Sequence, residues 1–370
     1  NINNMVTLMG DYVYGNCLSG HAFALHQETG KTVWVVRPSP NAGGDSGYPA
    51  AYDGLFVMGT DMGHDPRNDG GNEKVVALDG KTGKLMWEYK TEYPVWNVMP
   101  LFPGDDSCVF MDFTGGVYRV GLHNGTQLWH APAPGSGESF SDGGAILGSN
   151  DIVYACSNPG SSRGSEGTPG VLRAFQLSDG KLLWEQMLPQ PCNSYPSVGH
   201  LGGSPDLSVV ITPGAFMGTP TMHGGIMAFD AVTGMPQWQF QAPVYHSPPG
   251  IPPVLAAYGD YQGYEERHAA GVQDICLPAH WSCPTITGDG AVLAGRSDGN
   301  LYAIRGPAAR TDGRLPNLAH VRSTALLGID YATSDGVEAE IFEAKGASLH
   351  GASAFAPGMM AFSTCDTLYV

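Results

Sequence analysis

Residues Val75–Trp87 read Val-Val-Ala-Leu-Asp-Gly-Lys-Thr-Gly-Lys-Leu-Met-Trp. An apolar run leads into a turn at Gly80–Gly83, and a second apolar run ends on Trp87. Two apolar runs joined by a tight turn that contains glycine are typical of a β-hairpin. The same thirteen-residue frame recurs at four further places, which are Ala22–Trp34, Val117–Trp129, Leu172–Trp184 and Ile226–Trp238.

Three positions of the frame keep their chemical character from copy to copy. Each copy ends on a tryptophan and carries a glycine four residues earlier, which supplies a positive φ at little steric cost. The tryptophans are Trp34, Trp87, Trp129, Trp184 and Trp238, and the glycines are Gly30, Gly83, Gly125, Gly180 and Gly234. The residue ten before the tryptophan is alanine except in the third copy, which has Arg119. A small residue that recurs at one strand position indicates close approach of a neighbouring sheet.

The repeats predict the architecture of the chain. The tryptophans lie 53, 42, 55 and 54 residues apart, slightly more than the periods typical of propellers and solenoids, which indicates loop insertions. Two further units, at His280–Arg305 and Gly351–Val370, keep the first half of the frame. We therefore predict an all-β fold, a β-propeller of four-stranded antiparallel blades with seven countable repeats. The pattern leaves seven against eight blades open.

This frame resembles the pyrroloquinoline-quinone-type repeat, whose pattern is roughly apolar-Tyr-Ala-Leu-Asp-x-x-Thr-Gly-Lys-x-x-Trp. The superfamily contains quinoprotein alcohol dehydrogenases and non-enzymatic outer-membrane-assembly propellers. The resemblance implies that the five tryptophans pack between blades. If the chain were a dehydrogenase, it would also imply a quinone cofactor with calcium, a disulfide between adjacent cysteines, and a tryptophan beneath the cofactor, for which Trp96 and Trp281 are the candidates.

Composition limits the partners of the chain. It has 370 residues and a formal net charge of −17, which disfavours nucleic acid and anionic lipid surfaces. No apolar run is long enough for a transmembrane helix. The first residue is Asn1 and no signal-peptide pattern precedes the first unit, so we expect a mature or truncated form. We expect protein partners, and an extracytoplasmic or organelle-lumen location.

Two long stretches interrupt the repeats. We expect one propeller domain over residues 1–370, with insertions at Gln241–Ala279 and Gly306–Leu349, and an ordered element at Val337–Ala344 within the second. The first insertion is rich in proline and tyrosine, which suits a protein contact. Its candidate anchors are Tyr245, Tyr258, Tyr261 and Tyr264. The alternative is that this insertion folds back over the propeller as a lid.

Motifs for catalysis and for metal binding are missing. There is no Cys-x-x-Cys-His or His-Glu-x-x-His, and no two cysteines are adjacent. Two Gly-x-Ser-x-Gly matches, at Gly160–Gly164 and Gly295–Gly299, fall in a loop and a hairpin rather than in a strand-to-helix turn. The loop Asp61–Glu73 does not fit the EF-hand pattern. We therefore assign no catalytic or metal residues.

The seven cysteines are mostly placed in apolar strands, where we interpret them as buried free thiols. The exception is the pair Cys276 and Cys283, for which we predict a disulfide that closes the end of the first insertion, with two unpaired thiols as the alternative.

Three functions remain open from the sequence. The first is a non-catalytic propeller, a scaffold or accessory subunit in a larger, membrane-associated assembly, with no cofactor. The second is a quinoprotein-type dehydrogenase that oxidises an alcohol or sugar with a quinone and calcium. The third is a secreted ligand-binding propeller. Intact structural repeats without cofactor motifs favour the first.

Overall fold

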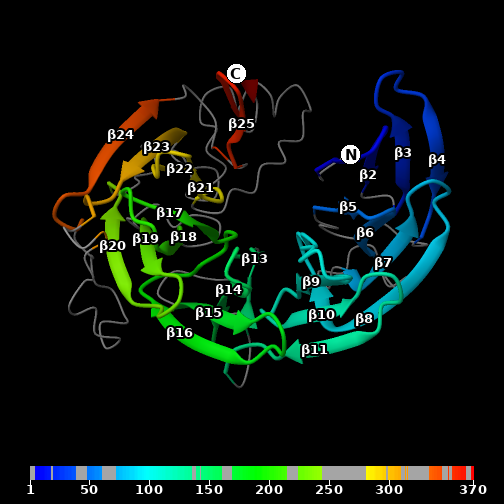
Figure 1. Ribbon diagram of the computed structural model, residues 1–370, viewed down its shortest axis with the longest axis horizontal. Coiled ribbons are helices and arrows are strands. Elements are labelled where there is room, and N and C mark those ends of the chain that lie inside the picture. The colour runs from blue at the N-terminus through cyan, green and yellow to red at the C-terminus, as the bar shows by residue number, and fades with distance from the viewer. Residues whose placement is uncertain are drawn as a thin grey trace, which may run out of the picture. The chain divides into compact units, whose positions relative to one another are not determined.

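A computed structural model describes residues 5–17, 20–38, 48–60, 72–135, 139–141, 143–160, 169–214, 224–243, 281–296, 299–309, 313, 315, 333–343, 349, 352–363 and 368–370. In these residues every regular element is a β-strand (Figure 1). The chain divides into two compact units. One contains Asn1–Pro134, Asp142–Ala155 and Phe175–Leu182, and the other contains Gly135–Ser141, Cys156–Ala174 and Leu183–Val370. The expectation of one domain over the whole chain stays a prediction.

The strands form seven antiparallel sheets within the described residues, which are blades of the β-propeller type. In the first unit these are β1–β4 (Thr7–Met9, Tyr12–Asn16, Ala22–His26, Thr32–Val36), β5–β8 (Ala50–Tyr52, Leu55–Thr60, Asn72–Asp79, Leu85–Val95) and β9–β11 (Ser107–Met111, Val117–Gly121, Gln127–Ala131). Consecutive strands are neighbours in each sheet, as expected for hairpins.

The fourth sheet is divided between the units and contains β12–β16 (Ser139–Phe140, Ala145–Leu147, Ile152–Pro159, Gly170–Gln176, Leu182–Leu188). The second unit adds three sheets, which are β17–β20 (Ser197–His200, Leu207–Ile211, Gly225–Asp230, Pro236–Gln241), β21–β24 (Thr285–Ile286, Val292–Gly295, Asn300–Arg305, Glu338–Glu343) and β25–β27 (Ala354–Ala356, Met359–Ser363, Leu368–Tyr369). Strand β24 lies in the predicted ordered element Val337–Ala344, and this prediction is confirmed.

The conserved turn of the frame has a local physical cause. Asp79 Oδ1 accepts hydrogen bonds from the Thr82 N–H at 2.8 Å and the Thr82 hydroxyl at 2.7 Å. These bonds lower the pKa of Asp79, with the Thr82 hydroxyl as the largest cause. Asp230 and Thr233 repeat the arrangement in β19–β20. The next residue, Gly83, has a φ of 72°, which an L side chain adopts only with strain. Asp-x-x-Thr-Gly thus forms this turn in two of the five copies, and the glycine is the residue that all five copies share.

The alanine of the frame lies directly across from the tryptophan in the hairpin. Ala24 pairs with Trp34, and Ala77 pairs with Trp87. Both alanines are completely buried. The small side chain leaves room for the indole of the adjacent strand.

Each of four tryptophans reaches from the outer strand of its sheet to a turn of the next sheet. The indole N–H of Trp34 donates to Gly80 O at 2.9 Å, and that of Trp87 donates to Leu122 O at 2.6 Å. Trp129 donates to Leu177 O at 2.8 Å, and Trp184 donates to Ala231 O at 3.3 Å. A residue buried in one sheet thus satisfies a backbone carbonyl of the next.

The frame glycines complete this contact. A Cβ added to Gly83 would lie 2.8 Å from the ring of Trp34, and one added to Gly125 would lie 2.9 Å from the ring of Trp87. Apolar clusters fill the space between successive sheets, and one of them contains Tyr14, Trp34 and Phe56. The repeat therefore encodes the packing of a sheet on its neighbour as well as the hairpin itself.

Candidate functional site

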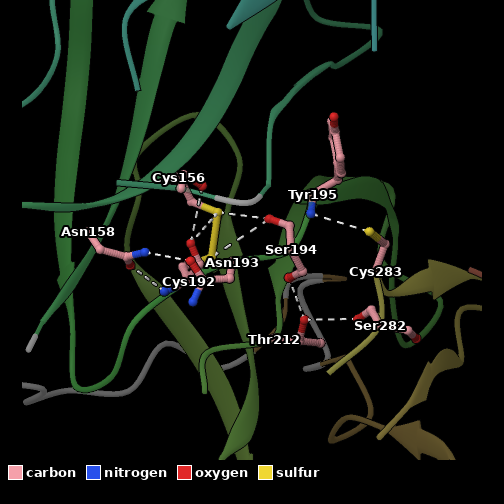
Figure 2. The surroundings of a disulfide bond; sticks show 10 residues. Cys156, Asn158, Cys192, Asn193, Ser194, Tyr195, Thr212, Ser282 and Cys283 are labelled. Atoms are coloured by element: carbon pink, nitrogen blue, oxygen red, sulfur yellow. Dashed lines mark hydrogen bonds between the residues drawn. A yellow bond between two sulfur atoms is a disulfide. The ribbon is translucent and has the colours of Figure 1, made fainter. Parts of the chain in front are cut away.

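A buried polar cluster surrounds a disulfide in the second unit (Figure 2). We call it the disulfide cluster and define it as Cys156, Asn158, Cys192, Asn193, Ser194, Thr212 and Ser282. Each of these residues is less than a tenth exposed. They come from β14, from the loop between β16 and β17, from the end of β18, and from the segment before β21. Residues far apart in sequence therefore meet here.

The disulfide joins Cys156 to Cys192, and their Cα atoms are 5.9 Å apart. This finding corrects the interpretation of these cysteines as buried free thiols. Both are completely buried, as that interpretation requires, but they are bonded to each other. The two cysteines are 36 residues apart and share no motif, and the folded chain brings the loop that contains Cys192 beside Cys156 on β14.

Asn158, two residues after Cys156 on β14, fixes the same loop. Its amide Nδ2 donates to Asn193 Oδ1 at 2.7 Å, and its Oδ1 accepts from the Cys192 N–H at 2.6 Å. Figure 2 shows Asn158 and Thr212 on opposite sides of the disulfide. The loop is thus held to β14 by one covalent bond and two buried hydrogen bonds. Breaking either hydrogen bond is costly because it leaves a buried polar group unpaired.

On the other side, hydroxyl groups link the loop to two further sheets. Ser194 Oγ and Thr212 Oγ1 are 2.6 Å apart, and the Thr212 hydroxyl donates to Ser282 O at 3.2 Å. The Ser282 hydroxyl accepts from the Gly295 N–H at 2.8 Å. The cluster therefore connects the sheets that contain β14, β18 and β22.

The chemistry of the cluster is neutral. It contains amides, hydroxyls and a disulfide, but no carboxylate, imidazole or amine to act as a general acid or base at neutral pH. Among the residues that the structure describes, no group of three or more His, Cys, Asp or Glu side chains is arranged to hold a metal ion. The arrangement suits a rigid joint between sheets.

A second buried network, in the first unit, does contain an ionisable group. Asp112 Oδ1 accepts from the N–H groups of Thr114 and Gly116, both at 2.9 Å, and its Oδ2 accepts from the Tyr118 hydroxyl at 2.8 Å. Burial raises the pKa of Asp112, although these hydrogen bonds act in the opposite direction. Burial also raises the pKa of Tyr118. The carboxyl group spans the turn between β9 and β10, and we interpret it as a structural cap of that turn.

Arg119, the exception in the frame, bridges two sheets. Its Nη1 donates to Leu177 O at 2.8 Å, the same carbonyl that accepts from Trp129, and its Nε donates to Ser107 Oγ at 2.9 Å. Nη2 is paired with Asp105. Arginine at the alanine position thus adds a second contact to the next sheet. The sequence showed the exception but gave no reason for it.

The structure places the frame residues in one recurring environment. Trp34, Trp87, Trp129 and Trp238 are buried, and Trp184 is partly buried. The five frame glycines all have positive φ, between 65° and 72°. Gly83, Gly125, Gly180 and Gly234 each lie against the tryptophan of the preceding copy, whereas Gly30 has open space around it.

The remaining predicted positions lie mostly outside the described residues. Tyr245, Tyr258, Tyr261, Tyr264 and Cys276 are among these, so their assigned roles stay predictions. Cys283 is described, and its sulfur accepts from the Tyr195 N–H at 3.4 Å.

The two tryptophans outside the frame have different surroundings. Trp281 is buried beneath the guanidinium of Arg296, whose Cζ is 5.3 Å from the ring centroid. Trp96 is partly buried and stacks on Phe113. Arg296 itself is almost completely buried, and sequence reasoning missed it. The only signal was its place inside one of the Gly-x-Ser-x-Gly matches.

Comparison with known proteins places these blades in a family. The family described as "outer membrane protein assembly factor BamB" matches residues 19–239, which is more than half of the chain. The chain belongs to this family. The match covers all five copies of the frame with its tryptophan and glycine, apart from the last residues of the fifth hairpin. The resemblance to the pyrroloquinoline-quinone-type repeat is therefore confirmed.

Two members of the BamB family each share 23% identity with this chain. The assembly factor BamB of Burkholderia pseudomallei is 23% identical over 344 residues, which cover 80% of this chain and 82% of that protein. BamB of Xanthomonas campestris is also 23% identical, over 79% of each chain. The crystal structure of BamB from Moraxella catarrhalis has a TM-score of 0.58 and 16% identity, and the comparison covers 99% of this chain and 83% of that one. At 16% identity, the similarity to the Moraxella catarrhalis structure supports the fold of this chain and not its function.

Dehydrogenases also appear among the relatives. Quinohemoprotein alcohol dehydrogenase ADH IIB of Pseudomonas putida is 28% identical over 199 residues, which are 50% of this chain but only 26% of that enzyme. The disulfide of this chain joins cysteines 36 residues apart, whereas the resemblance to the dehydrogenases implied a disulfide between adjacent cysteines. No helix in the described part of the chain is long and apolar enough to cross a membrane.

Proposed function

We propose that this chain is a non-catalytic β-propeller scaffold, an accessory subunit that makes protein–protein contacts in a larger, membrane-associated assembly. The observation that carries the proposal is the BamB family match over residues 19–239. The matched relatives are named as outer membrane protein assembly factors, and two of them align over about four fifths of this chain.

The chemistry of the described residues agrees with a scaffold. The buried cluster in the second unit is neutral, and the buried carboxyl of Asp112 accepts hydrogen bonds from its own turn and from Tyr118 on β10. Rigid sheets joined by tryptophans and a disulfide suit a body that presents loops to partners. The disulfide also favours an oxidising, extracytoplasmic compartment.

We further propose that the insertion Gln241–Ala279 contributes a partner contact through Tyr245, Tyr258, Tyr261 and Tyr264. Deletion of Pro248–Gly271 then releases the partner while the thermal transition changes little. Loss of the fold on deletion would instead indicate that the insertion is a lid over the blades.

A second candidate function is a quinoprotein-type dehydrogenase, favoured by the 28% identity to the Pseudomonas putida enzyme over half of this chain. Two measurements distinguish the scaffold from the dehydrogenase. The purified chain is titrated with pyrroloquinoline quinone and calcium, and it is then assayed for dye reduction with an alcohol. The scaffold proposal predicts no saturable binding and no dye reduction. Saturable binding with turnover would replace it with the enzyme.

A further inference from the structure

Strand β24 differs from the other outer strands in the residue that faces the alanine of the frame. Ala303 occupies the alanine position of the sixth unit, and its partner in β24 is Glu340. In the hairpins of β3–β4, β7–β8 and β19–β20 the corresponding partner is a tryptophan. Glu340 is exposed, so β24 does not make the tryptophan contact that fixes those strands.

Strand β24 also lacks the irregularity that those outer strands share. In the first sheet, Ala24 pairs with Trp34 and Leu25 pairs with Thr32, so Val33 is an extra residue in β4. Strands β8, β11 and β20 have the same register shift before their tryptophans. Such bulges twist an edge and discourage pairing with another strand. In contrast, β24 pairs with β23 over six consecutive residues without a shift.

The side chains of β24 are exposed on both faces of the sheet. Successive residues of a strand point to opposite faces. Glu338, Glu340 and Phe342 share one face and Ala339 and Ile341 share the other, and all five are exposed. Phe342 is 52% exposed and Ile341 is 45% exposed. In the described residues β24 ends the order β21-β22-β23-β24, so its outer edge has no strand beside it there (Figure 1).

The charge around this edge is negative. Glu338 and Glu340 lie on β24, and Asp289 lies nearby, paired with Arg305 at 2.7 Å. Arg305 is the cross-strand partner of Glu338. Among these four described residues, it is the one with a positive charge. Three acidic side chains against one arginine leave an excess of negative charge, which attracts a basic segment and repels a second copy of this acidic chain.

The neighbouring sheet shows how an outer edge takes up another segment. The Ser334 N–H donates to Gln239 O at 2.9 Å, and the Gln239 N–H donates to Ser334 Oγ at 3.0 Å. The Gln241 N–H donates to Thr333 Oγ1 at 3.0 Å. Thr333 and Ser334, which precede the turn at residues 335–336, thus bond to the outer edge of β20.

We propose that β24 is a docking edge for an extended, basic segment of a partner protein, which adds to the sheet as a further antiparallel or parallel strand. Its backbone pairs with the outer edge of β24, its basic side chains lie on the sheet face of Glu338 and Glu340, and its apolar side chains lie on the other face, against Ala339 and Ile341. This inference rests on the proposed scaffold function and names the chemistry of one partner contact.

Charged residues on an edge strand also serve to prevent aggregation. Glu338 and Glu340 fit that role, but a regular register beside exposed Ile341 and Phe342 does not, because both features favour pairing. A docking edge should bind a basic peptide, whereas an edge that only prevents aggregation should not.

The test uses an end-blocked, fluorescent peptide of alternating lysine and valine, added to the whole chain. The variants are Glu340→Lys and, as a matched control, Glu185→Lys on the exposed outer strand β16, which makes the same change in net charge. We expect saturable binding that Glu340→Lys weakens at least tenfold and Glu185→Lys changes less than twofold, with both thermal transitions unchanged. Hydrogen exchange of the Glu338–Glu343 amides should slow when the peptide binds.

Three results would overturn the proposal. These are no saturable binding, equal weakening by the two variants, or equal binding of a peptide N-methylated at every residue, which has no backbone N–H to donate to the sheet. Dimers of the chain that Glu340→Lys abolishes would assign the edge to a second copy and also overturn it. If the Glu340→Lys variant stays in the native assembly as well as the control does, the edge proposal fails while the scaffold function stands.

Discussion

Gly83→Ala tests the contact between sheets that the repeat encodes. The φ of Gly83 is 72°, and a Cβ there would lie 2.8 Å from Trp34 Cδ2 and 3.0 Å from Val36 Cγ1. Left-handed backbone costs an L residue about 1–2 kcal/mol. Overpacking against a fixed indole adds about 1–3 kcal/mol. Together these predict a loss of about 2–5 kcal/mol in the free energy of unfolding.

Gly30→Ala provides the matched control. Gly30 occupies the same frame position with a φ of 65°, but a Cβ there would have nothing within 4 Å. It therefore carries the backbone cost of about 1–2 kcal/mol without the clash. The difference between the two variants isolates the contact with Trp34, for which we expect about 1–3 kcal/mol.

Denaturant unfolding followed by circular dichroism measures both variants, and hydrogen exchange locates the effect. Gly83→Ala should speed exchange around Trp34, whose indole N–H donates to Gly80 O, while Gly30→Ala should not. Equal losses of stability for the two variants would refute the reasoning, because the loss would then come from the turn alone.

Three further outcomes follow from the structure. Replacing Cys156 and Cys192 with alanine should lower the free energy of unfolding by about 2–4 kcal/mol, measured by the same denaturation, and no change would show that the bond does not form. Trp238→Ala should cost about 3–5 kcal/mol because its side chain is 1% exposed, and a loss below 1 kcal/mol would contradict its place in the core. The pKa of Asp289 is lowered to about 2, chiefly by the Thr287 hydroxyl, so its stabilising effect is present above the unfolded value of 3.8 and is lost as the pH falls through about 2. In Thr287→Val, NMR titration should show this pKa move up towards 3.8, and an unchanged value would remove the hydroxyl as the cause.

Much of the fold follows from the sequence because the repeat determines it locally. The Asp-x-x-Thr-Gly turn, its positive φ and the tryptophan four residues later all act within one hairpin. The same glycine and tryptophan also set the contact between sheets. The place of strand β24 was predicted, as an ordered element at Val337–Ala344, but its unusual register was not, because the register depends on its pairing with β23.

The disulfide cluster was not predictable, because its residues share no motif. Cys192 lies in a loop outside the frame, 36 residues from Cys156 in the sequence, and only the folded chain brings the two together. The predicted partner of Cys283 lies outside the described residues, so that pairing is untested. Arg119 was visible as an exception, but its partner, the Leu177 carbonyl, is 58 residues away.

The mass of the native assembly that contains this chain tests the central claim most directly. The chain should be purified with a small affinity tag from its own source, in a detergent that solubilises the membrane and leaves complexes intact. The mass of the purified complex is then measured by native mass spectrometry. The scaffold function predicts a stable complex well above the 39.0 kDa of the chain alone, with other proteins in fixed ratio. A species with the mass of a single chain that binds a quinone with calcium and reduces a dye with an alcohol would contradict it.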